Sequence, residues 1–425
     1  MGMHFRRAQM VLILATSLTA CVSASPVAVA QSQAPREKPQ ISDTEKAEVA
    51  KGGRTFALDL YHQIGVTSQG NLILSPYSIT LPLAMLYAGA HGETEQQIRA
   101  AAHFTAPQSA FHSALNVIDS DLFDRASDET RGFQLNIANS VWGEQGYSFR
   151  QDYLDTLAKN YGSGIQLVDF EGQSEGARLT INHWVEQKTQ DKVKDILPPN
   201  AITPDVRLVL ANAIYFRANW ESQFDVTQTH PQDFHLMDGT TVSVPTMFQV
   251  NRFNYRQFDK YQIIELPYLA QDFSMLIILP NAEDFDDLDS QFTVEDFDNS
   301  VEQLQPTDLS LSLPKFKIQS NLSLPAPLKA LGMVNAFDPS TADFTGIGQP
   351  SLYIGEGFHS AEIEVNEDGT EAAAATVIVA VTEAAMPLPE LEVKVDHPFI
   401  FAIYDRYNGM ILFLGRVMNP VGSDD

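Results

Sequence analysis

Carboxylate and imidazole side chains are the first candidates for chemistry in this sequence, because both groups bind metal ions and transfer protons. Glu283–Asp289 gathers several carboxylates, but this run lacks the glycine at position six and the glutamate at position twelve of a calcium-binding EF-hand loop. His91 precedes Glu93 without the second histidine that a zinc-binding HExxH helix needs. We interpret the acidic run as a solvated helix start and His91 as part of a surface loop.

The usual catalytic motifs are missing as well. The sequence contains no GxSxG nucleophile elbow, no Walker A loop and no GxGxxG dinucleotide fingerprint. We therefore predict no catalytic residues, no metal, no cofactor and no enzymatic activity.

The most unusual stretch lies near the C-terminus. Glu367-Asp368-Gly369-Thr370-Glu371 is followed by four alanines, a threonine, an apolar β-branched run over 377–381, and then the segment Thr382–Pro387. Taken alone, this pattern predicts a buried strand followed by a proline-containing loop.

The types of side chain at every second position show whether this stretch could enter a sheet as a strand, because successive side chains of a strand point to opposite faces. The set that would enter a core comprises Thr370, Ala372, Ala374, Thr376, Ile378, Ala380 and Thr382. The opposite set comprises Glu371, Ala373, Ala375, Val377, Val379, Val381 and Glu383. A slip of one residue would bury Glu371 unpaired, at a cost on the order of several kcal/mol. Gly369, just before the first set, permits the backbone swing that would start insertion.

The elements expected around this stretch belong to the α+β class. We expect one domain over residues 44–425, with large, mainly antiparallel sheets and surrounding helices, because no second Pro/Gly/Ser-rich break follows residue 44. Ser42 and Glu45 form a capping box for a helix through Phe56, Leu60 and Ile64. Further helices are predicted over Ile79–Ala90, Arg150–Tyr161 and Ala177–Asp191. Strands are predicted over Arg207–Phe216, Gln262–Pro267, Ser274–Leu279, Leu309–Pro314, Ala361–Val365, Phe399–Tyr404 and Ile411–Val417.

The N-terminus has the features of an export signal. A short basic start precedes the apolar run Met10–Ala15, which is too short to span a bilayer. Leu18-Thr19-Ala20-Cys21 resembles the bacterial lipobox, so we predict a signal peptide over 1–20, lipidation of Cys21 and a flexible tether over 21–43. The alternative is cleavage after Ala30, with Cys21 discarded. In both cases we expect an exported protein. It would be anchored to the cell envelope, or it would be periplasmic or extracellular. Its one cysteine excludes an intramolecular disulfide.

The charge balance excludes several partners. With 27 Lys and Arg against 54 Asp and Glu, the formal net charge is −27. Nucleic acids, anionic membrane surfaces and heparin-like polyanions would be repelled by such a chain.

Several motifs together resemble the serpin family of serine protease inhibitors, over about residues 44–420. The first is the small-residue stretch after Glu367, which is similar to a serpin hinge and reactive-centre loop. The others are Asn71–Ile79, Leu210–Phe216 with Trp220, Glu265–Tyr268, Asp396–Phe401 and Leu414–Pro420. Each is moderately specific, but their shared order and spacing make a chance match untenable.

The resemblance implies a suicide inhibitor of serine proteases, with a reactive-centre loop over about 367–390. The protease attacks the loop as a substrate and forms an acyl-enzyme, and the cleaved loop then inserts into the central sheet. The implied hinge residues are Glu367, Gly369, Thr370, Glu371, Ala372, Ala373, Ala374 and Ala375. The alternative is a non-inhibitory serpin, a binding or carrier module that is cleaved as a plain substrate. Bulky, charged or proline residues at the inserting hinge positions usually mark that group, and here Thr370, Ala372 and Ala374 hold those positions.

The scissile bond follows from the family's usual count of seventeen residues starting at the hinge glutamate, which ends here at Glu383. Cleavage of Glu383–Ala384 would suit a glutamyl endopeptidase. Shifted cleavage, at Thr382, Ala384 or Ala385, would suit an elastase-like pocket. Met386 would suit a chymotrypsin-like enzyme, but the following Pro387 hinders cleavage. Trypsin-like targets are disfavoured, because residues 368–392 contain no Lys or Arg.

The resemblance also assigns residues to sheet opening. Ser75, Ser78, Asn212 and His359 match the polar cluster beneath the point where the central strands part, and Trp220, Lys315 and Glu367 match the region where the loop enters. Activation by heparin is not expected, because the segment 111–133 carries only Arg125 and Arg131 against five acids. We expect a monomer whose apolar run over 377–381 can add to a neighbour's sheet and form loop–sheet polymers.

Overall fold

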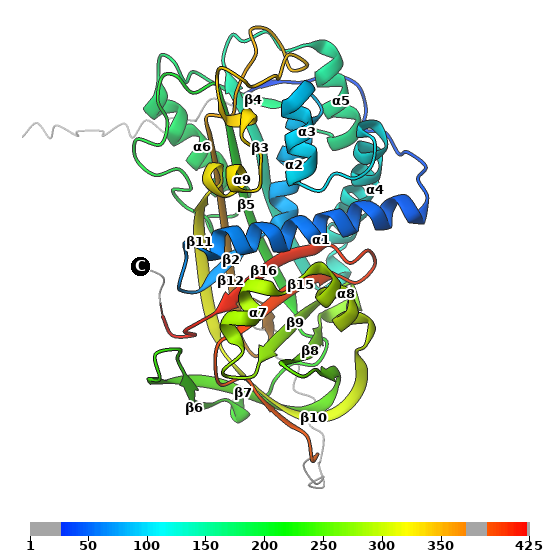
Figure 1. The fold of residues 1–425 in the computed structure, drawn as a ribbon, viewed down its shortest axis with the longest axis vertical. Helices are drawn as coiled ribbons and strands as arrows, with labels where there is room; N and C mark the ends of the chain where they lie inside the picture. Colours follow the sequence, from blue (N-terminus) through cyan, green and yellow to red (C-terminus); the bar gives the residue numbers. More distant parts are fainter. Residues whose placement is uncertain (1–26, 371–388, 423–425) are drawn as a thin grey trace, which may run out of the picture.

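The computed structural model describes residues 27–370 and 389–422. The described part of the chain contains two large sheets, and α1 crosses the molecule between them (Figure 1). The first sheet contains, in spatial order, β1 (Ala28–Ala30), β4 (Ile165–Val168), β3 (Phe133–Glu144), β5 (Leu208–Asn219), β13 (Gly369–Thr370), β12 (Glu356–Val365) and β11 (Phe316–Ser323). The predicted α+β class with large, mainly antiparallel sheets is confirmed.

The second sheet lies in the lower half of Figure 1. In spatial order it contains β14 (Glu392–Lys394), β10 (Gln305–Pro314), β7 (Thr241–Gln257), β8 (Tyr261–Pro267), β9 (Phe273–Pro280), β15 (Phe399–Asp405), β16 (Ile411–Val417) and β2 (Leu72–Leu74), with β6 (His230–His235) paired to β7. The described helices are α1 (Asp43–Gly65), α2 (Pro76–Tyr87), α3 (Gly92–Ala101), α4 (Gln108–Ala126), α5 (Gln151–Tyr161), α6 (Ser174–Lys188), α7 (Phe285–Gln291), α8 (Val294–Glu302) and α9 (Pro325–Ala330).

Local sequence signals explain how the helices begin. The Ser42–Glu45 capping box is present at the start of α1, and Phe56, Leu60 and Ile64 on that helix are buried. The next helix, α2, begins three residues before its predicted start, because Ser75 caps its first turn and Pro76 fits its first position. The acidic run ends in α7, as predicted. In the part of the chain that the structure describes, we find no helix long and apolar enough to cross a bilayer.

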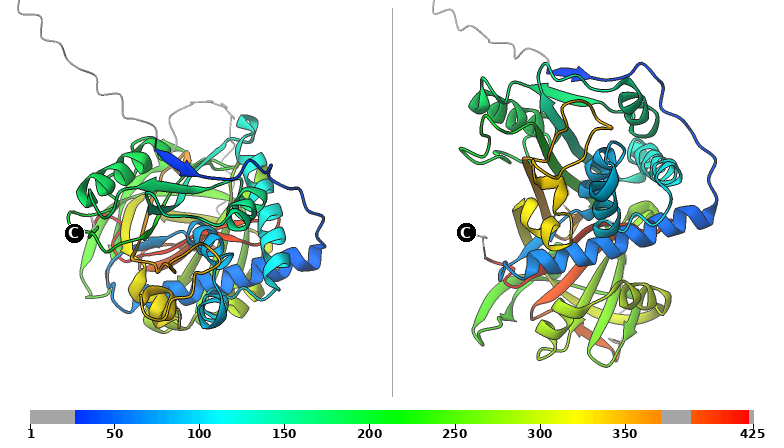
Figure 2. Two further views of the ribbon diagram at one scale, coloured as in Figure 1. Left: turned by 90° about the horizontal axis from the view of Figure 1, so that it is seen from above. Right: turned by 45° about the horizontal axis from the view of Figure 1, so that its top comes forward.

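The first sheet separates two clusters of buried side chains. Figure 2 shows how the helices and the two sheets are arranged from two further directions. One face of β5 carries Leu210, Ile214 and Phe216 into the main core, between this sheet and the second one. The other face carries Val209 and Ala211 against α6. A strand buried on both faces is largely apolar, which explains why β5 was recognisable in the sequence.

Part of the segment that we expected to be a flexible tether is bound to the domain. Strand β1 pairs antiparallel with the edge strand β4, and Ala28 lies opposite Leu167. Farther along, Arg36 donates from Nε to Asn116 Oδ1 at 2.7 Å and from Nη2 to Asp119 at 2.6 Å. An open sheet edge and an acidic helix supply these partners, and composition alone does not reveal either. Residues 28–36 are therefore held to the domain.

Candidate functional site

The candidate site follows the junction between β5 and β12, which we call the seam. These strands pair in parallel over most of β12, with His359 opposite Asn212. At one end of the seam the short strand β13 lies between them: Thr370 pairs antiparallel with Ala218 of β5 and with Val365 of β12. The first sheet is therefore already parted at this end and closed along the rest of the seam.

Glycine is required where the chain enters the seam. A Cβ atom on Gly369 would lie 2.0 Å from the backbone oxygen of Ala218. A contact this short is a steric clash, so a larger residue would push β13 away from β5. The hinge glycine thus serves close approach of two backbones.

We call the side chains around this end the entry cluster: Trp220, Tyr268, Lys315, Glu367 and Thr370. Trp220 holds the turn before β13, because its backbone N–H donates to Asp368 O and its Nε1 donates to Asn366 O, both at 2.9 Å. Its ring stacks on Tyr268 with 4.6 Å between centroids. The Tyr268 hydroxyl in turn lies 2.6 Å from the buried hydroxyl of Thr370.

Glu367 anchors the other side of the turn. Its carboxylate accepts from Lys315 Nζ at 2.7 Å and from Thr229 Oγ1 at 2.8 Å. Burial alone would raise the pKa of this carboxyl, but the hydrogen bonds from Lys315 and Thr229 outweigh burial and lower the pKa of Glu367 from its ordinary value. The anchor is therefore ionised at neutral pH.

Farther along the seam lies the seam cluster, formed by Ser75, Ser78, Asn212 and His359, all fully buried. The backbone N–H of Ser75 donates to His359 Nε2 at 2.9 Å, and Asn212 Nδ2 donates to the backbone oxygen of Ser78 at 3.0 Å. The first turn of α2 is thus bonded to both strands of the seam.

The protonation of His359 follows from these contacts. Burial lowers its pKa to about 3, so the ring is neutral at physiological pH. Because Nε2 accepts the Ser75 N–H, the ring proton lies on Nδ1. No hydrogen-bond partner reaches that Nδ1, nor Asn212 Oδ1, among the described residues.

Comparisons with known proteins identify this architecture. The family model for serpins (serine protease inhibitors) matches residues 51–420. The chain belongs to the serpin family. Rat leukocyte elastase inhibitor A is 36% identical over 386 residues, covering 88% of this chain and all of the rat protein. An uncharacterised serpin-like protein of Methanosarcina mazei is 34% identical and covers 97% of each chain.

Solved serpin structures show the same fold. Native tengpin, a thermophilic serpin, superposes with a TM-score of 0.80 at 28% identity, over 91% of this chain and 96% of that one. Uncleaved ovalbumin superposes with a TM-score of 0.79 at 25% identity, over 88% of this chain and all of that one.

The residues predicted to govern sheet opening in this serpin lie in the two clusters. Ser75, Ser78, Asn212 and His359 come together from α2, β5 and β12, and Trp220, Lys315 and Glu367 meet around the hinge. Their roles stay predictions. The reactive-bond candidates Thr382, Glu383, Ala384, Ala385 and Met386, the hinge residues 371–375 and Cys21 lie outside the described residues.

Two residues at this end of the seam were not identified from the sequence: Tyr268, a member of the entry cluster, and Thr229, which donates to Glu367. Tyr268 was recognised only as part of a motif, and Thr229 was not singled out. Tyr268 directly follows the predicted strand Gln262–Pro267, and an aromatic residue there is more often simple core. Thr229 lies far from Glu367 in sequence, so no local pattern connects the two residues.

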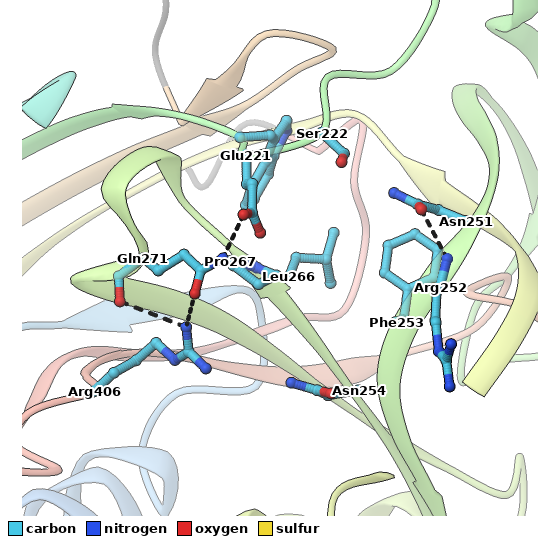
Figure 3. A pocket seen from close by; sticks show the side chains of 11 residues that line it. Glu221, Ser222, Asn251, Arg252, Phe253, Asn254, Leu266, Pro267, Gln271 and Arg406 are labelled. Carbon is cyan, nitrogen blue, oxygen red and sulfur yellow. Dashed lines mark hydrogen bonds between the residues drawn. The ribbon is translucent and has the colours of Figure 1, made fainter. Parts of the chain in front are cut away.

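A cavity of about 370 Å³ lies beside Trp220 (Figure 3). Its lining is polar, and several of these groups bond to one another: Gln271 donates to Glu221, and Arg406 donates to Gln271. This cavity borders the entry cluster from outside the seam. We assign it no chemistry, because its side chains show no nucleophile paired with a base.

Proposed function

We propose that this serpin is a suicide-substrate inhibitor of serine endopeptidases. The observation that carries the proposal is the position of β13, which already lies between β5 and β12 and leads into the loop. The reactive loop needs only to extend a strand that has begun to form.

The covalent step is ordinary acyl transfer. The protease serine Oγ attacks the carbonyl carbon of Glu383, the peptide bond to Ala384 breaks, and the amine of Ala384 leaves with the proton of the serine. The result is an ester between the protease and the loop. Insertion then carries the ester and the attached protease along the seam before water can hydrolyse the bond.

Insertion is expected to be favourable on physical grounds. If about a dozen new backbone hydrogen bonds each contribute roughly 1 kcal/mol net, the gain is on the order of 10 kcal/mol. The pairing of β13 sets the inward face: Thr370 is buried, so the alternate residues from 372 to 382 would follow it into the core. All of these are small or medium and uncharged.

The proposed target is a glutamyl endopeptidase or an elastase-like protease. A glutamate at the scissile bond supports a glutamyl endopeptidase. The neighbouring threonine and alanines support an elastase-like protease, as does the similarity to leukocyte elastase inhibitors.

We further propose that the protein is exported and lipidated at Cys21. Mass spectrometry of the protein from its native membranes would show an acylated N-terminal cysteine, or a start after residue 30 if the prediction is wrong.

The proposal is tested by incubating the protein from Cys21 onward with a glutamyl endopeptidase, elastase and chymotrypsin. We expect a protease complex that survives SDS, and a released C-terminal fragment starting at Ala384. Ala374→Arg is the matched variant, because its charge would have to enter the core on insertion. This variant should be cleaved at the same bond without trapping the protease. Cleavage of the unaltered protein without any complex would favour the binding or carrier module instead.

Polymerisation gives an independent test of the same loop. We expect mild heating to convert the monomer into loop–sheet polymers, which size-exclusion chromatography would detect. Unchanged monomer size after heating would contradict this part of the proposal.

A further inference from the structure

Strand β14 follows the predicted reactive-centre loop and returns the chain to the second sheet. Among the described strands it pairs with β10 alone, in parallel, with Val393 opposite Leu311. Val393 and the following Val395 are buried in the main core, whereas Glu392 and Lys394 are exposed. An edge strand of three residues makes few hydrogen bonds of its own, so its attachment depends on the residues that follow it.

The segment 396–398 connects β14 to β15 and is tied to β6 and to β9. The backbone N–H of His235, at the end of β6, donates to Asp396 O at 2.7 Å. The ring of His397 lies between two oxygen atoms. Its Nδ1 is 2.7 Å from Asp396 Oδ1, and its Nε2 is 2.8 Å from the backbone oxygen of Pro280, which ends β9. His397 therefore joins the connection after β14 to the end of a central strand of the same sheet.

The two contacts of this ring require two protons. A carboxylate oxygen and a backbone carbonyl oxygen only accept hydrogen bonds, and a neutral imidazole carries a single N–H. Both contacts can be hydrogen bonds only when the ring is the doubly protonated imidazolium. After loss of one proton, a bare ring nitrogen faces an oxygen lone pair and one of the two bonds is lost.

The groups around the ring favour its charged form. In the described part of the chain, the titratable groups that act on this contact are Asp396 and, on β6, His235, while β9 presents the Pro280 carbonyl. Burial alone would lower the pKa of His397, but the hydrogen bonds to Asp396 and Pro280 outweigh burial and raise this pKa from its ordinary value. The hydrogen bond from His397 also lowers the pKa of Asp396.

The direction of the pH dependence follows from the raised pKa. Such a group stabilises the folded state fully below its unfolded pKa of about 6.5, and this contribution is lost as the pH rises through the folded value. The contact of His397 should therefore be intact in weak acid and weakened in weak alkali.

We propose that His397 is a proton-controlled latch that holds β14, the strand after the reactive-centre loop, to the second sheet. When protonated, the ring ties the connection after β14 to both Asp396 and the end of β9. When neutral, it keeps one of these bonds, and β14 separates from β10 more readily. The latch goes beyond the proposed inhibitory function and does not depend on it, because no protease takes part.

Amide hydrogen exchange of the full chain, expressed as protection factors so that the intrinsic pH dependence of exchange is removed, tests the latch. Between about pH 6 and about pH 8.5, protection at residues 391–397 should fall about fivefold, as expected for the loss of one hydrogen bond, while protection along β15 stays constant. His397→Lys keeps a cation throughout this range and His397→Gln stays neutral, so neither variant should show the fall.

His235→Gln is the matched control, because it removes the other titratable ring near Asp396 and keeps the backbone N–H that bonds to Asp396 O. This variant should retain the fall in protection. An NMR titration of the His397 ring should give a pKa above about 6.5. Protection that does not change with pH in the unaltered protein, a fall that survives in His397→Gln, or a fall that disappears in His235→Gln would overturn the proposal. Failure to trap a protease would count against the proposed function and leave the latch standing.

Discussion

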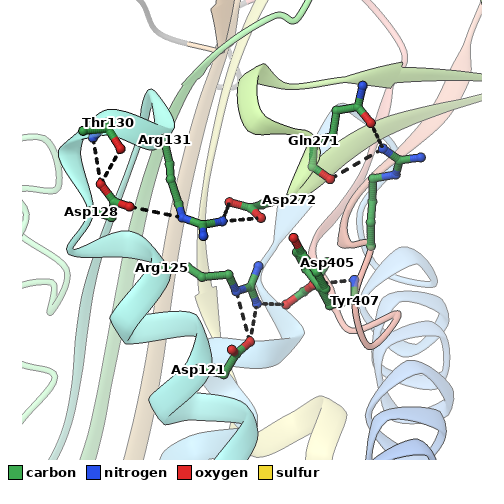
Figure 4. A network of polar contacts seen from close by, with 10 residues as sticks. Asp121, Arg125, Asp128, Thr130, Arg131, Gln271, Asp272, Asp405 and Tyr407 are labelled. Carbon is green, nitrogen blue, oxygen red and sulfur yellow. Dashed lines mark hydrogen bonds and ion pairs between the residues drawn. The ribbon is translucent and has the colours of Figure 1, made fainter.

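The seam cluster is buried, and the polar network around α4 has a buried centre, but the two are held together by different interactions. In the network, Arg125 forms an ion pair with the buried Asp405, and Arg131 forms one with the buried Asp272 (Figure 4). These pairs join α4 and the turn that follows it to the end of β15 and to the residue before β9. In the seam cluster the contacts are neutral hydrogen bonds, and the buried Ser78 Oγ, Asn212 Oδ1 and His359 Nδ1 have no partner among the residues that the structure describes.

The difference indicates where the molecule can part. Removing one partner of a buried ion pair costs about 3–5 kcal/mol, because the other charge is left without compensation. A neutral hydrogen bond contributes only about 1 kcal/mol net. We therefore expect α4 to stay attached to the second sheet while β5 and β12 separate.

The largest expected loss in the free energy of unfolding comes from removing an ion pair of the network. Arg125→Ala leaves Asp405 buried and unpaired and should lower the free energy of unfolding by about 3–5 kcal/mol in urea titrations. Arg150→Ala is the matched control, because Arg150 pairs with Asp152 at an exposed position and should lose at most about 1 kcal/mol. A loss of the same size in both variants would remove the contrast between the two regions.

The seam should weaken in acid because of His359. A histidine whose folded pKa is lowered binds fewer protons folded than unfolded, so stability is full above the unfolded value of about 6.5 and falls as the pH drops toward about 3. The contribution of this residue reaches at most about 1.4 kcal/mol per pH unit. His359→Gln should flatten this part of the stability profile. Because His112 is also buried with a lowered pKa, the comparison with His112→Gln identifies the residue responsible.

A substitution in the entry cluster should lower the free energy of unfolding by less. Trp220→Phe removes the hydrogen bond to Asn366 O but retains an aromatic ring against Tyr268, so we expect a loss of about 1 kcal/mol. Amide hydrogen exchange at residues 366–370 should rise about fivefold. If exchange rises equally along β12 near His359, then the two clusters open together and not in sequence.

Much of the fold could be predicted because many of its helices and strands are encoded in short patterns of neighbouring residues. The Ser42 capping box, the apolar strands β5, β9, β15 and β16, and the hinge pattern all carry their information within a few neighbouring residues. Strands β3 and β7 were not predicted. Along β7, buried and exposed positions alternate irregularly, and β3 includes polar residues such as Asn136 and Asn139 that weaken its apolar pattern.

The sequence by itself determined the alternation of the loop, the small hinge and the family to which the chain belongs, since these depend on residues close to one another or on motifs in order. Only the tertiary structure decided which residues face one another across the seam. Asn212 and His359 are far apart in the chain, and they become neighbours because β5 and β12 pair in one register out of many. That register depends on packing of whole strands against the core, which no local pattern encodes.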